Sequence, residues 1–401
     1  MAGLRYIAPA LAVAAGAAAQ ACGGGSGTTT IQSNADATGL SNCQTYSGSI
    51  AIATGTTDSI QLSGITSISG SLVANNVTDM TSLAADSLQE IGEEFNLNGL
   101  TVLSTLNFPA LKKVDTIEWI ALPALQGLSF TAGVEEINML TIDNTQLGSL
   151  DGINLQVADT VSVTNNPYLT SVNMQLGNVT KSLTFGANGR DLEIEFPNLI
   201  WAYNLTFRNC SDISLPSLAS INGSLGFYSN GFKSLSAPNL TSVGGSLSFV
   251  SCEEVTNITL PELTTIGGGF LVANNTALED IDGFSALKTV GGALDFNGAF
   301  TNVSLPDLSD VRGAFNLQST KDIDDACSYF QPLSGQNNVI KGEYTCKGEE
   351  SNPQGTGTLE PGTNSGSGSS SSTTSSSAAY PMLIPGATGV LGVVAAIFGL
   401  L

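Results

Sequence analysis

The stretch TTIGGGFLVANNTALEDI, residues 264–281, decides the fold because its opening phrase recurs along the chain. TSVGGSLSFVS begins at Thr241, KTVGGALDFNG at Lys288 and SINGSLGFYSN at Ser220. Aligned on the leading residue of each phrase, the repeats are about 22 residues apart, which predicts a solenoid whose turns stack on one another. The repeat starts are Val179, Trp201, Ile221, Val243, Ile266, Val290 and Val311.

Within each phrase, apolar or small residues alternate with polar ones, as Leu225 and Phe227 do. A period of two predicts a short strand with one buried face. The second half of each repeat reads like NITLPELTT (257–265), and its proline predicts a corner, because proline cannot donate a ladder hydrogen bond. We expect the asparagine pairs that follow several strands to cap turns or to stack as a ladder. These pairs are Asn75/Asn76, Asn165/Asn166 and Asn274/Asn275.

The repeats predict an all-β solenoid of about twelve turns of about 22 residues between residues 45 and 325. Residues 115–150 fit the pattern poorly, so the count is least certain there. The expected organisation places a cap at each end of this solenoid and a processing signal at each end of the chain. It comprises a signal peptide (1–21), a disulfide-looped N-terminal cap (22–44), the solenoid (45–325), a C-terminal cap with a disulfide (326–350), a Gly/Ser/Thr-rich stalk (351–380) and a hydrophobic tail (381–401).

Both ends of the chain resemble processing signals. A short basic start precedes an alanine-rich apolar run, and Ala19-Gln20-Ala21 fits a cleavage site; a membrane helix is the alternative. The polar stalk and the terminal apolar tail have the layout of a GPI-attachment signal that is removed on attachment, with a tail-anchored membrane protein as the alternative. The four candidate attachment residues, which the sequence does not separate, are Asn364, Gly366, Gly368 and Ser377.

Two further features agree with an extracellular protein. Six cysteines permit three disulfides. Proximity favours Cys22–Cys43 and Cys327–Cys346, which leaves Cys210 and Cys252; two turns apart, this last pair would be roughly 9–10 Å apart in a regular ladder, too far for a disulfide. Either the turns bulge there or both thiols are free.

The nine N-glycosylation sequons start at Asn76, Asn178, Asn204, Asn209, Asn222, Asn239, Asn257, Asn274 and Asn302.

The charge and composition exclude several functions. The chain has 12 basic and 34 acidic residues and a net charge of −22, which argues against nucleic acid as a partner. The absence of histidine removes Ser-His-Asp and Cys-His catalysis and imidazole metal ligands. The cysteines are too dispersed for a metal cluster, so we expect no cofactor and no metal.

The ordered combination of features resembles one family along essentially the whole chain. A signal peptide, ADATGLSNCQTYSG (35–48), the repeated VGGSL and FPxL phrases, a Ser-rich stalk and a GPI tail are similar to fungal GPI-anchored cell-wall organisation proteins, related to the yeast sporulation-specific wall proteins. The repeats resemble the receptor L domain of insulin- and growth-factor-receptor ectodomains. The resemblance implies a right-handed β-helix, similar to leucine-rich repeats, at the plasma membrane or in the wall. It brings no catalytic residues.

The leading functional hypothesis is therefore a non-enzymatic, GPI-anchored surface glycoprotein needed for wall organisation and integrity. Its expected partners are wall polysaccharides or wall proteins, and the membrane through the GPI lipid. A glycan-active enzyme needs two carboxylates at a fixed separation; we interpret Glu253/Glu254, Glu279/Asp280 and Asp324/Asp325 as solvated charges in turns. A third hypothesis is a glycan- or protein-binding, receptor-like module.

A sugar platform would need exposed aromatic rings, and the predicted outward columns contain few. Tyr228, with Arg208 one turn earlier, is the exception, while Trp201, Tyr203 and Phe207 fall on the inward parity. The two outward columns are predicted to be Asn204, Ser224, Ser246, Gly269, Ala293 and Thr206, Gly226, Ser248, Leu271, Asp295.

Overall fold

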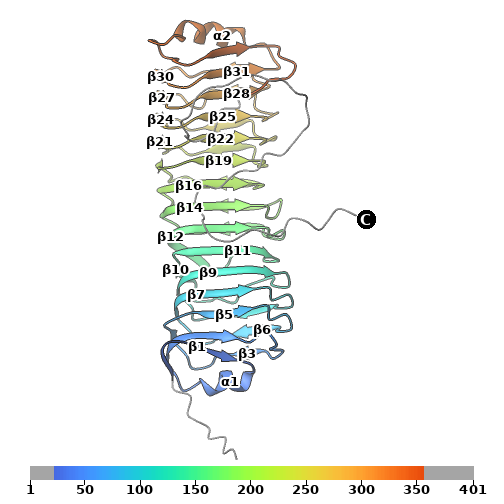
Figure 1. Ribbon diagram of the computed structural model, residues 1–401. Helices are drawn as coiled ribbons and strands as arrows, with labels where there is room; N and C mark the ends of the chain where they lie inside the picture. The colour runs from blue at the N-terminus through green and yellow to red at the C-terminus, as the bar shows by residue number, and fades with distance from the viewer. Residues whose placement is uncertain (1–21, 356–401) are drawn as a thin grey trace, which may run out of the picture. The chain divides into compact units, whose positions relative to one another are not determined.

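The structure of the protein is a computed structural model in which residues 22–355 are described. The expected signal peptide, most of the stalk, the apolar tail and the four candidate GPI-attachment residues lie outside the described residues. Within residues 22–355 the chain winds into a column of stacked β-strand turns (Figure 1). The predicted β-solenoid is confirmed.

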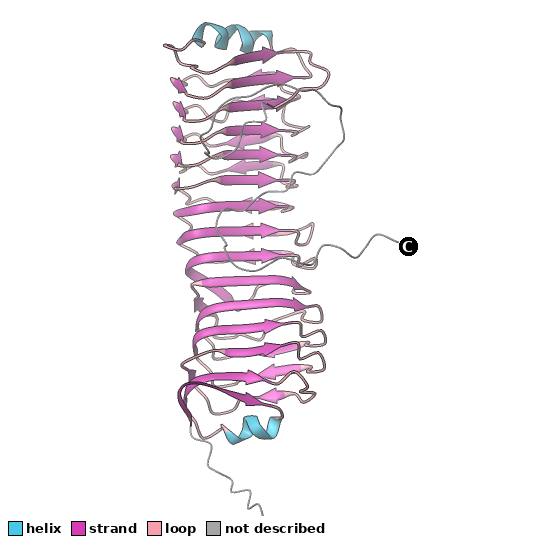
Figure 2. Ribbon diagram, viewed as in Figure 1, coloured by secondary structure: helices cyan, strands magenta, loops and turns pink. Residues whose placement is uncertain are grey.

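One parallel sheet of 22 strands runs the length of the column (Figure 2). Strands β2 to β31 make thirteen successive rungs, close to the expected dozen, and β1 and β32 add a pairing strand at each end. The N-terminal half of this main sheet contains β1 (Gly23–Ile31), β2 (Thr45–Ile52), β4 (Ser67–Ile68), β5 (Leu72–Asn75), β7 (Glu90–Asn98), β9 (Lys113–Leu122), β10 (Val134–Glu136), β11 (Met139–Thr145), β12 (Ile153–Thr164) and β14 (Asn178–Gly186). The C-terminal half contains β16 (Trp201–Arg208), β18 (Ser220–Ile221), β19 (Leu225–Tyr228), β21 (Ser242–Val243), β22 (Leu247–Val250), β24 (Thr265–Ile266), β25 (Phe270–Ala273), β27 (Thr289–Val290), β28 (Leu294–Gly298), β30 (Asp310–Val311), β31 (Phe315–Ser319) and β32 (Tyr344–Lys347).

The irregular residues 115–150 belong to the same stack. Strand β9 pairs with β7 on one side and with β10 and β11 on the other, so two complete rungs occupy the region where the sequence pattern is weak. The register shifts between Val134 and Glu136 of β10 as it passes β12. This irregularity blurs the repeat in the sequence without breaking the ladder.

The second half of each repeat forms short parallel strands on another side of the column. These strands are shorter because each repeat turns a corner at its proline phrase, and proline cannot donate to a ladder. Four small sheets result, formed by β3 (Ile60–Gln61), β6 (Ser82–Ala84) and β8 (Thr105–Asn107); β13 (Ser171–Asn173), β15 (Glu193–Glu195) and β17 (Asp212–Ser214); β20 (Ser234–Ser236) and β23 (Asn257–Thr259); and β26 (Asp280–Ile281) and β29 (Asn302–Val303).

A helix lies at each end of the column (Figure 1). Helix α1 (Asn34–Gly39) begins with a capping box in which Ser33 accepts a hydrogen bond from the Asp36 backbone N–H. Helix α2 (Asp324–Phe330) continues into a short 3-10 helix, η1 (Gln331–Leu333). Each helix covers an end rung, as an open solenoid requires, because an uncovered end would expose apolar core.

The inward side chains of the main sheet form a continuous apolar core. Phe185, Phe207, Phe227 and Phe249 stack on successive rungs, with ring centroids 6.4, 5.6 and 4.9 Å apart. All four rings are fully buried. The close stacking of rungs also explains the paired glycines, since a Cβ on Gly267 would lie 2.1 Å from the Gly244 carbonyl oxygen.

Two of the three asparagine pairs, Asn165/Asn166 and Asn274/Asn275, have divided roles at the corner after a main strand. The first residue, as at Asn165 (φ 56°) and Asn274 (φ 58°), adopts the left-handed conformation that asparagine tolerates. The second residue points inward and joins a ladder: Asn166 Oδ1 accepts from the Thr145 backbone N–H at 3.1 Å, and Asn166 Nδ2 donates to Asn188 Oδ1 at 3.0 Å. The predicted ladder is therefore present, and it is fully buried at Asn166 and Asn275. At Asn75/Asn76 both residues are exposed, Asn76 adopts the left-handed conformation, and Val77 takes the inward position.

Candidate interaction surfaces

The outward face of the main sheet, here called the sheet face, offers small polar side chains rung after rung. The predicted columns align in register: Thr206 lies opposite Gly226, Gly226 opposite Ser248, and Ser248 opposite Leu271. Ser248, Ala293 and Asp295 are buried, however, so the prediction that the columns are exposed is wrong at these positions. Side chains also bond between rungs. Asn96 Nδ2 donates to Glu118 Oε2 at 3.0 Å on the N-terminal rungs. The face is therefore a regular array of hydroxyl, amide and carboxylate groups about 4.8 Å apart along the stack.

Tyr228 and Arg208 form the aromatic contact that the sequence indicated on this face. The Arg208 guanidinium lies 4.2 Å from the centroid of the Tyr228 ring. Tyr228 lies over Gly226, where a Cβ would come within 2.5 Å of the ring. Because the ring is held between a glycine and a guanidinium, it covers the sheet instead of projecting from it.

Strand β16 corrects the predicted orientation of two aromatic residues. Phe207 points inward as expected, but Tyr203 is 48% exposed and Trp201 is half-buried. The reason is a β-bulge: Val179 pairs with Ala202 and Ser182 with Asn204, so three residue steps on β14 face two on β16. The bulge shifts the alternation, with the result that Ala202 and Leu205 are both buried and Tyr203 faces solvent.

These outward aromatics belong to a larger apolar cluster, here called the β16 step, formed by Val157, Ile200, Trp201 and Tyr203. Val157 and Ile200 are each 54% exposed. Asn178 of β14 lies between two members of the step, opposite Val157 on β12 and opposite Trp201 on β16. A group of exposed apolar side chains of this kind is typical of a site that another molecule covers.

The sequons are distributed unevenly over the column. Three of them, at Asn178, Asn204 and Asn222, lie on or beside the β16 step; the Asn222 backbone N–H donates to the Ala202 carbonyl at 3.0 Å. Between Asn76 and Asn178 the sequence contains no sequon, so β7 to β12 form a stretch of the sheet face without a glycosylation signal. Asn178 and Asn204 are half-buried; the exposed sequon asparagines are Asn76, Asn209, Asn222, Asn239, Asn257, Asn274 and Asn302.

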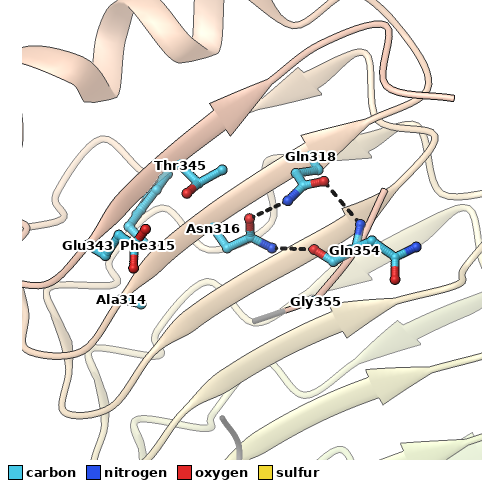
Figure 3. A pocket seen from close by; sticks show the side chains of 8 residues that line it. All are labelled: Ala314, Phe315, Asn316, Gln318, Glu343, Thr345, Gln354 and Gly355. Atoms are coloured by element: carbon cyan, nitrogen blue, oxygen red, sulfur yellow. Dashed lines mark hydrogen bonds between the residues drawn. The ribbon is translucent and has the colours of Figure 1, made fainter. Parts of the chain in front are cut away.

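The last described residues return over the C-terminal end of the sheet face (Figure 3). Asn316 Nδ2 donates to the Gln354 carbonyl at 2.8 Å, and the Gln354 backbone N–H donates to Gln318 Oε1 at 3.0 Å. Gln318 Nε2 also donates to Asn316 Oδ1 at 2.8 Å. The side-chain amides of Asn316 and Gln318 thus bind the backbone of Gln354. A shallow pocket of about 240 Å³ lies beside this contact and is lined by Phe315, Glu343 and Thr345 among others.

Two disulfides tie down the ends of the column. Cys22–Cys43 joins the start of β1 to the segment after α1, and Cys327–Cys346 joins α2 to β32.

The third pairing that the sequence left open is not formed: Cys210 and Cys252 are free and buried. They replace asparagines of the ladder on alternate rungs, and Asn230 lies between them, its Nδ2 3.9 Å from Cys252 Sγ. Two rung spacings exceed the reach of a disulfide.

Burial determines the chemistry of these two thiols. It raises the pKa of the Cys210 thiol to about 12 and raises the pKa of Cys252 as well. The thiolate is the reactive form of cysteine. Both residues therefore belong to the core and not to a reactive site.

The acidic pairs weighed as catalytic candidates are exposed. Glu253 and Glu254 lie in a turn, as predicted. The prediction of a turn is wrong for the other two pairs: Asp280 begins β26, and Asp324 and Asp325 form the first turn of α2. No cluster of three or more His, Cys, Asp or Glu side chains able to hold a metal is present among residues 22–355. In the same part of the chain, no helix has the length and apolar character needed to cross a bilayer.

Comparisons with known proteins agree on one kind of protein. A family model described as "Ecm33: GPI-anchored cell wall organization protein" matches residues 1–41. Protein ecm33 of Aspergillus fumigatus is 44% identical over 370 residues, 92% of each chain. The cell surface GPI-anchored protein of Arthroderma benhamiae is 42% identical over 355 residues, 88% of this chain and 90% of that one. Sporulation-specific protein 2 of Saccharomyces cerevisiae is 31% identical over 302 residues, 75% of this chain and 58% of that one. No solved structure matches the chain.

Proposed function

Because this chain belongs to the Ecm33 family of GPI-anchored cell-wall organisation proteins, we propose that it is a non-enzymatic surface glycoprotein that organises the fungal cell wall. The observation that carries the proposal is the 44% identity to an ecm33 protein along 92% of both chains, which spans the whole solenoid. The protein is placed at the cell surface, held by a glycolipid at one of the four candidate residues near the end of the stalk.

The sheet face is the proposed contact surface. Its polar columns repeat along a rigid stack, so many weak hydrogen bonds can add along an extended wall polymer or a wall protein. The stretch from β7 to β12 has no sequon and therefore no signal for an N-linked glycan, while it keeps outward polar groups such as Asn96 and Glu118. We place the contact with wall components on this sequon-free stretch.

A non-enzymatic role is supported by the arrangement of the acidic residues. Glycoside hydrolysis uses two carboxylates about 5–10 Å apart, one of them with a raised pKa. Hydrogen bonds lower the pKa values of Asp36, Asp159 and Asp310, and lysine or arginine neighbours contribute at Asp159 and Asp310. We expect incubation with glucan and chitin oligosaccharides to yield no cleavage or transfer products.

The runner-up function is a glycan-binding module, and one observation favours it. The β16 step exposes Tyr203 and part of Trp201 beside two apolar side chains, and sugar-binding platforms use such rings. In that case the purified protein would bind soluble wall polysaccharides directly, and Tyr203→Ala would weaken binding while preserving secretion.

Glycan masking tests the leading proposal. Thr160→Asn creates the sequon Asn-Val-Ser on β12, the last strand of the sequon-free stretch, since Val161 and Ser162 follow. Thr160 faces outward, opposite Met139 on β11 and Ser182 on β14. The matched control, Thr160→Asn combined with Ser162→Ala, carries the same asparagine without the sequon.

The variants are expressed in a strain that lacks the gene, and growth is scored on wall-stressing dyes. Wild type and the control should restore growth, while the glycosylated Thr160→Asn variant should reach the surface in normal amount and fail to restore it. Full rescue by a Thr160→Asn protein whose glycan is verified by mass spectrometry would exclude this stretch as the contact surface.

A further inference from the structure

The β16 step exposes apolar surface at a place where the sequence also provides sites for carbohydrate. Val157, Ile200 and Tyr203 are each about half exposed, and Trp201 is partly so. Apolar groups left in water cost roughly 25 cal/mol for each Å² that could otherwise be covered. A stable secreted protein therefore gains from a molecule that covers the step.

Asn178, on β14, lies between two members of this step in the strand order. It pairs with Val157 on one neighbouring strand and with Trp201 on the other. Adjacent strands are about 4.8 Å apart, and side chains directly opposite each other have Cβ atoms about 5 Å apart. The first sugar attached to the Asn178 amide would therefore lie between the side chains of Val157 and Trp201.

The two other nearby sequons are less well placed. The Asn204 side chain is turned toward the following rung, where its Oδ1 accepts from the Ser224 backbone N–H at 2.8 Å. Asn222 lies one rung beyond β16, next to the glycine corner at Gly223. Asn178 alone has members of the step on both sides.

We propose that Asn178 carries an N-linked glycan whose first N-acetylglucosamine packs against Trp201 and Val157 and covers the β16 step. The apolar C–H face of the pyranose ring and the acetamide methyl group supply the surface that an aromatic ring and a valine bind. The inference rests on the secreted, extracellular address contained in the proposed function, because N-glycosylation requires it.

An attached glycan is a better occupant of the step than a free wall polymer. Covalent attachment gives the sugar an effective concentration of roughly millimolar or more at the step. Glycans at Asn204 and Asn222 would also flank the step and obstruct a polymer approaching from outside. The step is thus interpreted as a seat for the protein's own carbohydrate.

The fluorescence of Trp201 can be used to measure this contact. It has two tryptophans, Trp119 and Trp201. Trp119 is fully buried in the core, so collisional quenching of fluorescence by acrylamide reports mainly on Trp201. Covering Trp201 lowers the quenching constant.

The test uses the full-length chain expressed in a fungal host and purified in detergent. Site occupancy at Asn178 is read by mass spectrometry, and quenching is compared between wild type and Asn178→Gln. Asn257→Gln, which removes an exposed sequon on β23, is the matched control. We expect Asn178 to be occupied, the quenching constant of Asn178→Gln to rise about twofold as the second indole becomes reachable, and the control to match wild type.

Enzymatic trimming of the folded wild-type protein keeps the test independent of how well the variant folds. Endoglycosidase H leaves the first N-acetylglucosamine and should preserve low quenching, whereas complete removal by peptide-N-glycosidase F should raise it. An unoccupied Asn178, or equal quenching before and after complete removal, overturns the proposal. The readout is independent of wall phenotype, so failure of the proposed function would leave it unchanged.

Discussion

Replacing Asn166 by alanine tests the buried asparagine ladder. Asn166 is fully buried, and its side chain has partners on both neighbouring rungs. Its Oδ1 accepts from the Thr145 backbone N–H at 3.1 Å, and its Nδ2 donates to the Ile142 carbonyl at 3.2 Å and to Asn188 Oδ1 at 3.0 Å. Alanine removes all of these bonds at once without changing the backbone conformation.

The magnitude follows from the groups left unpaired. A buried backbone donor or acceptor without a partner costs about 1–3 kcal/mol. Loss of the bonds to the Thr145 N–H and the Ile142 carbonyl therefore predicts a loss of roughly 2–6 kcal/mol in the free energy of unfolding. Single domains are stabilised by about 5–15 kcal/mol, so this loss is a large share of the total.

The neighbouring asparagine provides the matched control. Asn165 is exposed and adopts the left-handed conformation, with φ 56°. Asn165→Ala places a Cβ residue in that conformation and gives up a surface hydrogen bond to Asp143, which costs about 1 kcal/mol. The two variants differ by one position and share the same chemical change.

Urea unfolding of the ectodomain, truncated after Glu360 and followed by circular dichroism, measures both variants. Hydrogen exchange adds the location of the damage, since turns of a solenoid can open locally. Equal destabilisation by the two variants, or a loss below about 1 kcal/mol for Asn166→Ala, would show that the ladder does not stabilise the stack as argued here.

Three further outcomes are expected. Phe249→Asp should abolish secretion, because it places a charge in the stacked phenylalanine column, while Thr206→Asp on the sheet face should be secreted normally; comparable secretion of the two would contradict the observed orientations. Cys210 and Cys252 should resist alkylation at about pH 9 in the native protein and react in guanidinium, because burial keeps their pKa values above those of exposed thiols; rapid native labelling would contradict this. Gln318→Ala should accelerate proteolysis of residues 351–355, which limited digestion followed by mass spectrometry measures, because the Gln354 N–H loses its acceptor.

The sequence predicted the architecture because the architecture is repetitive. Each glycine-rich phrase and each proline corner satisfies the same local rule, so Val243, Ile266 and Val290 could be placed on equivalent rungs without long-range information. The turn and the ladder were both expected of the asparagine pairs as alternatives, but the division of these roles between the two residues of a pair was not. Residues 115–150 were harder, because their ladder is continuous while their corner residues depart from the repeat.

The features that escaped prediction depend on contacts that a local pattern does not encode. The capture of Gln354 by Asn316 and Gln318 joins residues 36 to 38 positions apart in the chain through side-chain amides. Nothing in the composition of residues 351–355 distinguishes them from the rest of a polar stalk. The free state of Cys210 and Cys252 was foreseen only as one of two options, because rung spacing excludes a bond in a regular ladder but cannot exclude a distortion.

The orientation of Trp201 and Tyr203 shows why a difference of one residue between neighbouring strands matters in a solenoid. If inward and outward residues alternated regularly back from Phe207, the side chains of Trp201 and Tyr203 would both face the core. The register shift between β14 and β16, at Val179 and Ser182, reverses their orientation. A bulge that exposes two aromatic side chains would be costly if they remained in water. Sequons at Asn178, Asn204 and Asn222 gather around this irregular strand. The backbone irregularity presents apolar surface outward, and the glycan that we propose at Asn178 would cover it.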